Sequence, residues 1–188
     1  MALLDIIVAP DPRLKKKSLA LDSVDKAAAK LMKDMLETMY EAPGVGLAAP
    51  QVGVLKRIIV VDPARENEKP QPIKMANPEI LWSSDEIKEY EEGCLSLPKA
   101  YDLVQRPDRI KVQYIDENNQ IQLIEADGIL AVVIQHEIDH LDGVLFVDHI
   151  STLKRGIILR RLTKLKKLGR NKKKTNAAKR RALDFTES

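Results

Sequence analysis

The stretch VVIQHEIDHLDG, residues 132–143, places two of the chain's three histidines four residues apart, with a glutamate beside the first. In an α-helix, residues four apart lie about one turn apart on the same face, so His136 and His140 can bind one ion. Glu137 lies next to them, and this H-E-x-x-H pattern is typical of two metal ligands with a general base. The preceding apolar run, residues 129–134, predicts a buried core helix that holds the histidines rigidly.

The spacing of residues does not determine a third metal ligand. A catalytic zinc-type centre has three protein ligands and an open position for water. His149, Cys94 and a carboxylate are all candidates for the third. A chance occurrence of the pattern on a surface helix is the alternative interpretation, and the apolar run before His136 argues against it.

The composition is that of a globular protein: 188 residues, of which 44% are hydrophobic and 31% charged. The single cysteine excludes an internal disulfide and indicates a reducing compartment. The N-terminus, MALLDIIVAPDPR, lacks a basic region, and Asp5 interrupts its apolar run, so it does not resemble a signal peptide. The longest apolar run is too short to cross a bilayer. These features predict a cytoplasmic protein without a membrane partner.

Charge is divided unequally along the chain. Residues 151–188 carry 14 Lys and Arg against two acidic residues, a charge of +12, whereas residues 1–150 carry −9. An acidic body with a basic tail indicates that the tail has a partner of its own. We expect a folded domain over residues 1–150, a basic amphipathic helix over residues 151–169 that ends at Gly169, and a disordered basic tail over residues 170–188.

The other patterns indicate one helix before a group of strands and another helix after it. We expect a helix from Ser23, its cap, to Glu41, and a second from Asp127, its cap, to Leu141. Glycine-rich residues 44–53 are expected to be extended. The expected strands are residues 57–62, 73–77, 79–91, 109–116 and 120–126, with turns at Pro78, 83–85 and 117–119. Strands grouped in this way indicate an α+β fold with antiparallel pairing.

Three segments together resemble one protein family. GVGLAAPQ (44–51), EGCLS (92–96) and QHEIDHLDG (135–143) are similar, in sequence, order and separation, to the three signature motifs of the peptide deformylases. The resemblance covers residues 1–168 and leaves the end of the basic tail outside it. The helical motif alone is a moderate signal, whereas all three motifs in one short chain form a specific one.

The resemblance implies an α+β fold in which antiparallel sheets surround a central HExxH helix, with an N-terminal helix and a C-terminal basic helix. Residues 1–150 then form the catalytic domain. The implied metal ligands are Cys94, His136 and His140, with His149 as a non-ligand. A thiolate with two imidazoles suits zinc or iron, and the resemblance implies ferrous iron (Fe²⁺), with zinc, nickel or cobalt as substitutes.

The resemblance also implies a reaction, the hydrolytic removal of the formyl group from the N-terminal formylmethionine of newly made polypeptides, with release of formate. Glu137 is implied to act as general base and later as general acid. Gln51, through its side-chain amide, and Leu95, through its backbone N–H, are implied to stabilise the oxyanion. The residues expected to bind the substrate are Val45, Gly46, Gly93, Ile129, Val132 and Val133, the last three facing the methionine side chain.

The implied partners are N-formylmethionyl nascent peptides and, through the basic C-terminal helix, the ribosome. In this respect the chain resembles bacterial deformylases that have a basic C-terminal helix and dock on the ribosome near the exit of the nascent chain. The basic side chains would bind the ribosome through attraction to RNA phosphates. The alternative is that the helix and tail are solvated and only keep the protein soluble. We expect a monomer.

Two competing functions stay open at this point. A zinc metallopeptidase shares the H-E-x-x-H pattern, and it predicts a His or Glu third ligand and tolerance of Cys94→Ser. A non-catalytic RNA-binding module predicts that Glu137→Ala changes nothing. Tyr101 and Arg106 have no assigned role; Arg106 could pair with Glu92, although an ordinary surface position is the simpler expectation.

Overall fold

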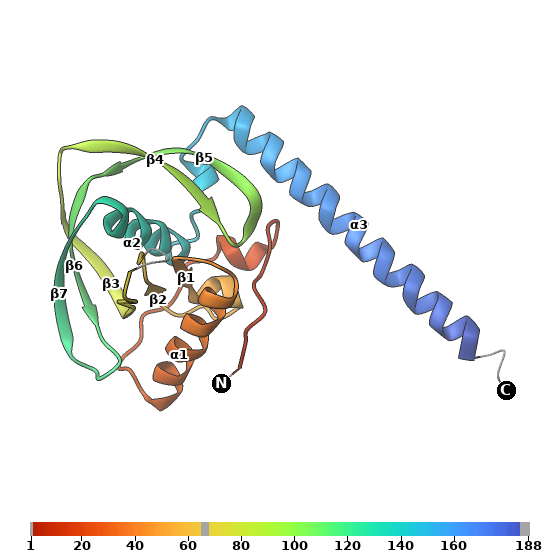
Figure 1. Cartoon of the computed structure of the whole chain (residues 1–188), viewed down its shortest axis with the longest axis horizontal. Coiled ribbons are helices and arrows are strands. Elements are labelled where there is room, and N and C mark those ends of the chain that lie inside the picture. Colours follow the sequence, from red (N-terminus) through yellow and green to blue (C-terminus); the bar gives the residue numbers. More distant parts are fainter. Residues whose placement is uncertain (1, 65–67, 185–188) are drawn as a thin grey trace.

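The computed structural model describes residues 2–64 and 68–184, and their side chains up to residue 168. Its main elements are α1 (Lys26–Glu41), β1 (Gly46–Ala48), β2 (Ile58–Val61), β3 (Ile73–Ser83), β4 (Ile87–Cys94), β5 (Leu97–Pro107), β6 (Arg109–Ile115), β7 (Ile121–Asp127), α2 (Gly128–Leu141) and α3 (Thr152–Asp184). Short 3₁₀ turns lie at Pro12–Lys15, Ala49–Val52 and Phe146–Asp148. This order of elements confirms the predicted α+β fold (Figure 1).

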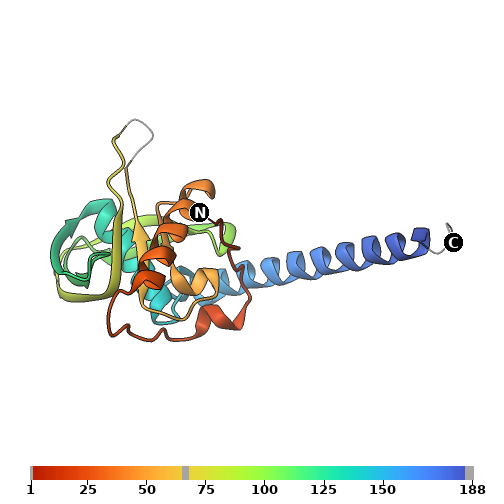
Figure 2. The ribbon, with the colours of Figure 1, turned by 90° about the horizontal axis from the view of Figure 1, so that it is seen from below.

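The strands form two antiparallel sheets. One has five strands in the order β1-β2-β3-β6-β7, and the other is the β4–β5 hairpin. The hairpin predicted from residues 109–116 and 120–126 is present as β6 and β7. Arg109 lies opposite Asp127, and Ile115 lies opposite Ile121. The helix α2 lies between the two sheets, and α1 packs on β1 and β2 (Figure 1 and Figure 2).

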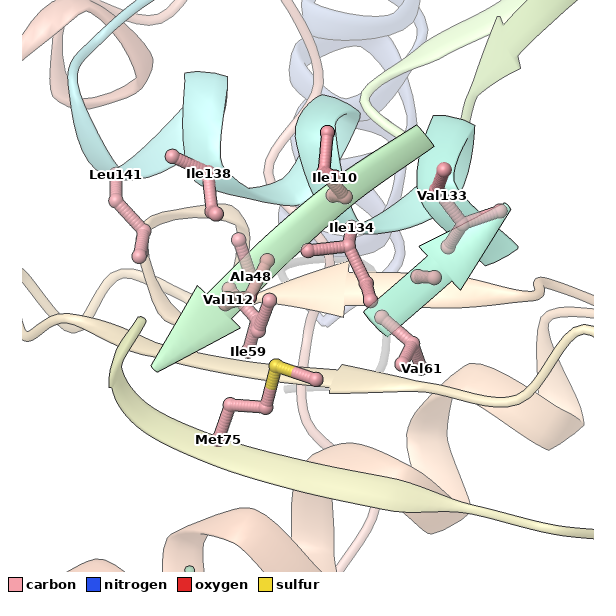
Figure 3. Packing of buried hydrophobic residues seen from close by; sticks show 12 residues of the cluster. Ala48, Ile59, Val61, Met75, Ile110, Val112, Val133, Ile134, Ile138 and Leu141 are labelled. Atoms are coloured by element: carbon pink, nitrogen blue, oxygen red, sulfur yellow. The ribbon is translucent and has the colours of Figure 1, made fainter. Parts of the chain in front are cut away.

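The helix α2 is buried on most sides, as its apolar sequence predicted. Val133, Ile134, Ile138 and Leu141 belong to one buried cluster with residues of the five-stranded sheet (Figure 3). The sheet residues of this cluster are Ala48, Ile59, Val61, Met75, Ile110, Val112 and Ala126. Burying an aliphatic side chain of this size contributes roughly 1.5–3 kcal/mol relative to leaving it exposed. This packing fixes the helix and, with it, the polar side chains on its remaining face.

The helix α1 begins at Lys26, later than the start predicted at Ser23. The side chain of Asp25 accepts a hydrogen bond from the Ala28 N–H, so Asp25 is the cap in place of Ser23. A carboxylate at this position also interacts favourably with the helix dipole. At α2, Asp127 precedes the first helical residue as predicted, but its side chain makes no capping hydrogen bond.

The strand β3 continues through Pro78, where the sequence predicted a turn. Asn77 has a φ of 47°, and the pairing with β6 shifts register between Ala76 and Glu79. A bulge of this kind accommodates a proline without ending the strand. The chain reverses at residues 84–86 instead, next to the second predicted turn.

The helix α3 runs from Thr152 to Asp184 and extends away from the body of the molecule (Figure 1 and Figure 2). The predicted end at Gly169, followed by a disordered tail, is therefore wrong for the backbone as far as Asp184. A glycine costs a helix interior roughly 1 kcal/mol relative to alanine, and the surrounding Lys, Arg, Leu and Ala residues favour a helix. The division into a catalytic body and a basic tail stays a prediction. Among the described residues, no helix combines the length and apolarity needed to cross a membrane.

Candidate active site

A cysteine and two histidines meet where the β4–β5 hairpin approaches α2. The ligand atoms of Cys94, His136 and His140 all lie within 4.8 Å of one another, and Cys94 Sγ is 3.2 Å from His140 Nε2. His149 is not part of this cluster, because its Nε2 lies 2.7 Å from Asp139 Oδ2. Of the candidates for a third ligand, the structure places Cys94 beside the histidine pair.

A neighbouring carboxylate determines the tautomer of His136. Nδ1 of His136 lies 2.7 Å from Glu92 Oε2, and Arg106 donates to the two oxygens of Glu92 at 2.7 and 3.0 Å. Burial raises the pKa of Glu92, but the hydrogen bonds from His136 and Arg106 outweigh burial and lower it to about 2. An ionised carboxylate only accepts hydrogen bonds. Nδ1 of His136 is therefore the donor in this contact, and Nε2 is the ring nitrogen that would bind a metal ion.

Arg106 is buried, which corrects the surface position expected from the sequence. Its exposed fraction is 5%, and besides Glu92 it contacts Asp139, with 2.6 Å between Nη1 and Oδ2. A guanidinium at this depth requires anionic partners, because an unpaired buried charge costs several kcal/mol. Since Glu92 is on β4, Arg106 on β5 and Asp139 on α2, this ion-pair network ties the hairpin to the helix.

The pKa values of the two histidines are shifted in opposite directions. Burial lowers the pKa of His136, but its hydrogen bonds to Cys94 and Glu92 raise it well above its ordinary value. Burial lowers the pKa of His140 well below its ordinary value, and the nearby His136 lowers it further, so His140 is a neutral imidazole. Two imidazoles and a thiol that reach one point are the donor set of zinc-like and iron-like divalent cations. The residues therefore fit a divalent metal ion.

Glu137 lies beside this cluster with one oxygen unpaired. Its Oε2 is buried and has no hydrogen-bond partner among the described residues. Burial raises the pKa of Glu137 to about 7. A carboxyl group that lines a pocket, with a pKa near neutrality, suits proton transfer in either direction.

The side-chain amide of Gln51 has its nitrogen directed toward Cys94. Gln51 Oε1 accepts from the Ala48 N–H at 2.7 Å, which identifies the other end of the amide as the NH₂ group. Nε2 then lies 3.4 Å from Cys94 Sγ and 3.2 Å from Ser96 Oγ. Residues Ala49–Val52 form a 3₁₀ turn, not the extended segment expected, and this turn folds Gln51 back toward the end of β1.

All the residues predicted to bind the substrate line one pocket with a volume of about 740 Å³. Contributions come from the segment before β1, from α2 and from the β4–β5 hairpin. The predicted residues that line it are Val45, Gly46, Gln51, Gly93, Cys94, Leu95, Ile129, Val132, Val133, His136 and Glu137. One ligand can therefore contact these residues together, while their individual roles stay predictions.

Two glycines allow close approach of the pocket walls. A Cβ at Gly46 would overlap Glu137 Oε1 and lie 2.8 Å from Val133 Cγ1. A Cβ at Gly93 would lie 2.5 Å from Cε1 of Tyr101. The missing side chains therefore let β1 approach α2 and let the Tyr101 ring lie over the hairpin.

The sequence did not reveal two features of this site. One is the contact of Glu92 with His136. The position of Glu92 in the EGCLS motif, two residues before Cys94, is a sequence signal that could have indicated this contact. The other is the pocket rim formed by Pro98–Tyr101. This rim carries no characteristic pattern of residue types, so no sequence signal indicated it.

Comparison with known proteins gives concordant results. The family model of polypeptide deformylases matches residues 3–156. Peptide deformylase of Methylocella silvestris is 53% identical over 171 residues, which cover 89% of this chain and 87% of the relative. That of Agrobacterium fabrum is 52% identical over 164 residues, 87% of this chain and 96% of the relative. The crystal structure of peptide deformylase from Ehrlichia chaffeensis has 40% identity and a TM-score of 0.85, covering 89% of this chain and 99% of its own.

The comparisons confirm both the fold class and the resemblance of the three motifs. The matched region contains every residue of the Cys94, His136 and His140 cluster. Together, the family and the donor set support a bound divalent metal. The chain therefore belongs to the polypeptide deformylase family, hydrolases that remove the N-formyl group from nascent peptides.

Proposed function

We propose that this pocket hydrolyses the formyl amide of N-formylmethionyl peptides with Cys94, His136 and His140 as the ligands of one divalent metal ion. The observation that carries the proposal is the convergence of the three ligand atoms within 4.8 Å, beside a pocket that also contains Glu137 with an unpaired oxygen. A metal held there supplies a Lewis acid that lowers the pKa of water and polarises a carbonyl oxygen.

Glu137 transfers the proton. Its carboxylate takes a proton from the attacking water while the water oxygen forms a bond to the formyl carbon. The protonated Glu137 then gives this proton to the amine nitrogen as the C–N bond breaks. The products are formate and a peptide with a free N-terminal methionine. The unpaired Oε2 leaves one oxygen of Glu137 available for both transfers.

Gln51 and Leu95 stabilise the negative oxygen of the tetrahedral intermediate. The Nε2 of Gln51 and the backbone N–H of Leu95 are the donors. The Ala48 N–H holds the Gln51 amide in place through Oε1, so little reorganisation is needed during the reaction. Each donor of this type lowers the barrier by about 2.7–4 kcal/mol.

The first residue of the substrate occupies the apolar part of the pocket. Its methionine side chain packs against Ile129, Val132 and Val133 of α2. Val45 and Gly46 bind the substrate backbone in an extended conformation, as a further strand beside β1. Gly93 contacts that backbone from the β4–β5 hairpin, where it lines the pocket beside the Tyr101 ring.

Ferrous iron is the native metal, and zinc, nickel or cobalt can replace it. A thiolate with two imidazoles accepts each of these ions, so the ligand set does not choose among them. Metal analysis of protein purified without oxygen tests the identity. One equivalent of iron per chain is expected, and zinc as the main metal under these conditions rejects iron.

The basic helix α3 brings the enzyme to the ribosome, and the enzyme works in the cytoplasm as a monomer. The charge of +12 over residues 151–188 attracts RNA phosphates, and such binding weakens as salt rises. A chain that ends at Leu168 tests this role, because it keeps Leu162, which is buried against the body. We expect weaker co-sedimentation with ribosomes than for the full chain. Undiminished binding that is insensitive to salt contradicts docking through the basic residues of α3. Light scattering measures the molar mass in solution, and the mass of one chain is expected.

Formate release decides between this proposal and a metallopeptidase. The metal-loaded protein is incubated with formyl-Met-Ala-Ser and, as a matched control, with Met-Ala-Ser. We expect formate from the formylated peptide and no cleavage of either peptide chain. Cleavage of peptide bonds in both substrates, without formate, overturns the proposed function.

A further inference from the structure

The first half of α3 packs onto the strand that borders the pocket. Leu162 has an exposed fraction of 1% and lies in one apolar cluster with Leu97 and Ala100 of β5. Lys154 Nζ lies 2.7 Å from Oδ1 of Asp102, also on β5. The helix therefore contacts β5 along the segment that begins at Leu97, directly after the two-residue turn that follows Cys94.

Arg161 adds a contact with the backbone of this segment. Its Nη2 donates to the carbonyl of Lys99 at 2.6 Å and to the carbonyl of Pro98 at 3.3 Å. Lys99 has a φ of 57°, in the left-handed region that residues other than glycine rarely adopt. A residue keeps such a conformation only where its surroundings fix it. The guanidinium of Arg161 provides part of that fixation, because it holds two successive carbonyls at the bend.

The segment that Arg161 holds is the rim of the pocket. Residues 98–101 all line the pocket, and Tyr101 at its end is 67% exposed. Val45, which also lines it, is 46% exposed, whereas Glu137 is 4% exposed. The exposed residues mark the opening, and Glu137 marks the interior. A peptide whose formyl group reaches Glu137 must therefore pass the rim with the residues that follow its first.

We infer that Arg161 is a positioning residue for the substrate, which fixes the rim at residues 98–101 and thereby strengthens binding of the peptide beyond its first residue. This role rests on the proposed function of the pocket. Arg161 acts through the backbone of Pro98 and Lys99. Without it, the rim samples other conformations, and ordering the rim upon binding lowers the affinity. A substrate that stops at its first residue is affected less.

Arg160 offers a matched control. It is the neighbouring residue of the same helix, it is exposed, and its side chain has no hydrogen bond or ion pair with the described residues. Arg161→Ala and Arg160→Ala remove the same charge from the same turn of α3. A difference between the two variants therefore reports the contact with the rim and not the charge of the helix.

The test compares KM of the metal-loaded enzyme for formyl-Met-Ala-Ser and for formyl-methionine amide. Arg161→Ala is expected to raise KM for the longer substrate about three- to tenfold, the effect of losing a charged donor at a partly exposed site. The changes in kcat and in KM for the amide are expected to be smaller. Arg161→Lys, which keeps a donor, recovers part of the affinity, and Arg160→Ala resembles the wild type.

Hydrogen exchange measured by mass spectrometry gives a second result that does not depend on activity. Amides of residues 99–103 are expected to exchange faster in Arg161→Ala than in Arg160→Ala. Equal KM values and equal exchange in the two variants overturn the inference. An equal rise of KM for both substrates also overturns it, because it indicates a general defect. If the wild type releases no formate, the proposed function fails and the substrate role of Arg161 fails with it, whereas the exchange result still reports the rim contact.

Discussion

Nδ1 of His136 on α2 lies 2.7 Å from Oε2 of Glu92 on β4. The orientation of His136, one of the three clustered donor residues, therefore depends on the Glu92 carboxylate, which belongs to another element. Arg106 on β5 holds that carboxylate through two hydrogen bonds. The Cys94, His136 and His140 cluster is thus coupled to the β4–β5 hairpin through Glu92. Substitutions in the hairpin should therefore change the affinity of the cluster for a metal ion.

Glu92→Gln is expected to weaken metal binding about 10- to 100-fold, as is typical when the partner of a metal-binding histidine is altered. Competition with a chelator measures the affinity. Glu92→Ala should also cost about 3–5 kcal/mol of unfolding free energy, because it leaves the buried Arg106 charge partly unpaired. Glu89→Gln, an exposed change on the same strand, is the control and should alter neither quantity. Wild-type metal affinity in Glu92→Gln contradicts the orienting role.

Glu137→Gln removes the proton acceptor with almost no change in size. We expect kcat for formate release to fall about 10²- to 10⁴-fold, the usual contribution of a general acid or base. Metal content should stay at the wild-type level, because Glu137 is not one of the three clustered ligands. Activity close to that of the wild type, with normal metal content, rejects Glu137 as the base.

Gly46→Ala is expected to lower activity and to cost about 1–3 kcal/mol of unfolding free energy, the usual effect of inserting a methyl group into packed surroundings. The added Cβ would overlap Glu137 Oε1 and press on Val133. Formate release and denaturant unfolding measure the two effects. Gly156→Ala on α3 is the control, because its Cβ would meet its first neighbouring atom only at 3.9 Å. That change should stabilise the protein by about 0.5–1 kcal/mol.

Removal of the metal should lower the melting temperature. A ligand that binds only the folded state stabilises it by about 4 kcal/mol when its free concentration is about a thousand times Kd. Calorimetry with and without a chelator measures the difference for the wild type and for Cys94→Ser. The difference should largely disappear in Cys94→Ser, since the thiolate is one of the three proposed ligands. An equal shift in both proteins would show that the metal binds elsewhere.

Asp11 should contribute to stability in a pH-dependent manner. Its hydrogen bond with Arg13 lowers the pKa of Asp11 from 3.8 to about 2. Because the folded-state pKa is the lower one, the contribution is complete above the unfolded value and is lost as the pH falls through about 2. The gap in unfolding free energy between wild type and Asp11→Asn should therefore narrow in acid. A gap that stays constant from neutral to acidic pH contradicts this coupling.

Local patterns in the sequence determined much of the fold. The apolar run before His136 and the spacing of the histidines predicted α2, and alternating residues predicted the β6–β7 hairpin. Predictions of element boundaries failed where a single proline or glycine was expected to end a strand or a helix. Pro78 lies in a bulge of β3 and Gly169 lies inside α3, because the strand pairing and the helix-forming neighbours outweigh one unfavourable residue.

The sequence by itself determined which residue types are present and which of them share a helix face, because those relations extend over only a few residues. The family resemblance predicted Cys94 as the third ligand, since spacing alone could not, and the structure places its ligand atom beside those of His136 and His140. Only the tertiary structure decided that Arg106 is buried between Glu92 and Asp139, and that Arg161 holds the rim of the pocket. Such contacts join segments far apart in the chain, and they depend on how the sheets pack around α2, which no local pattern encodes.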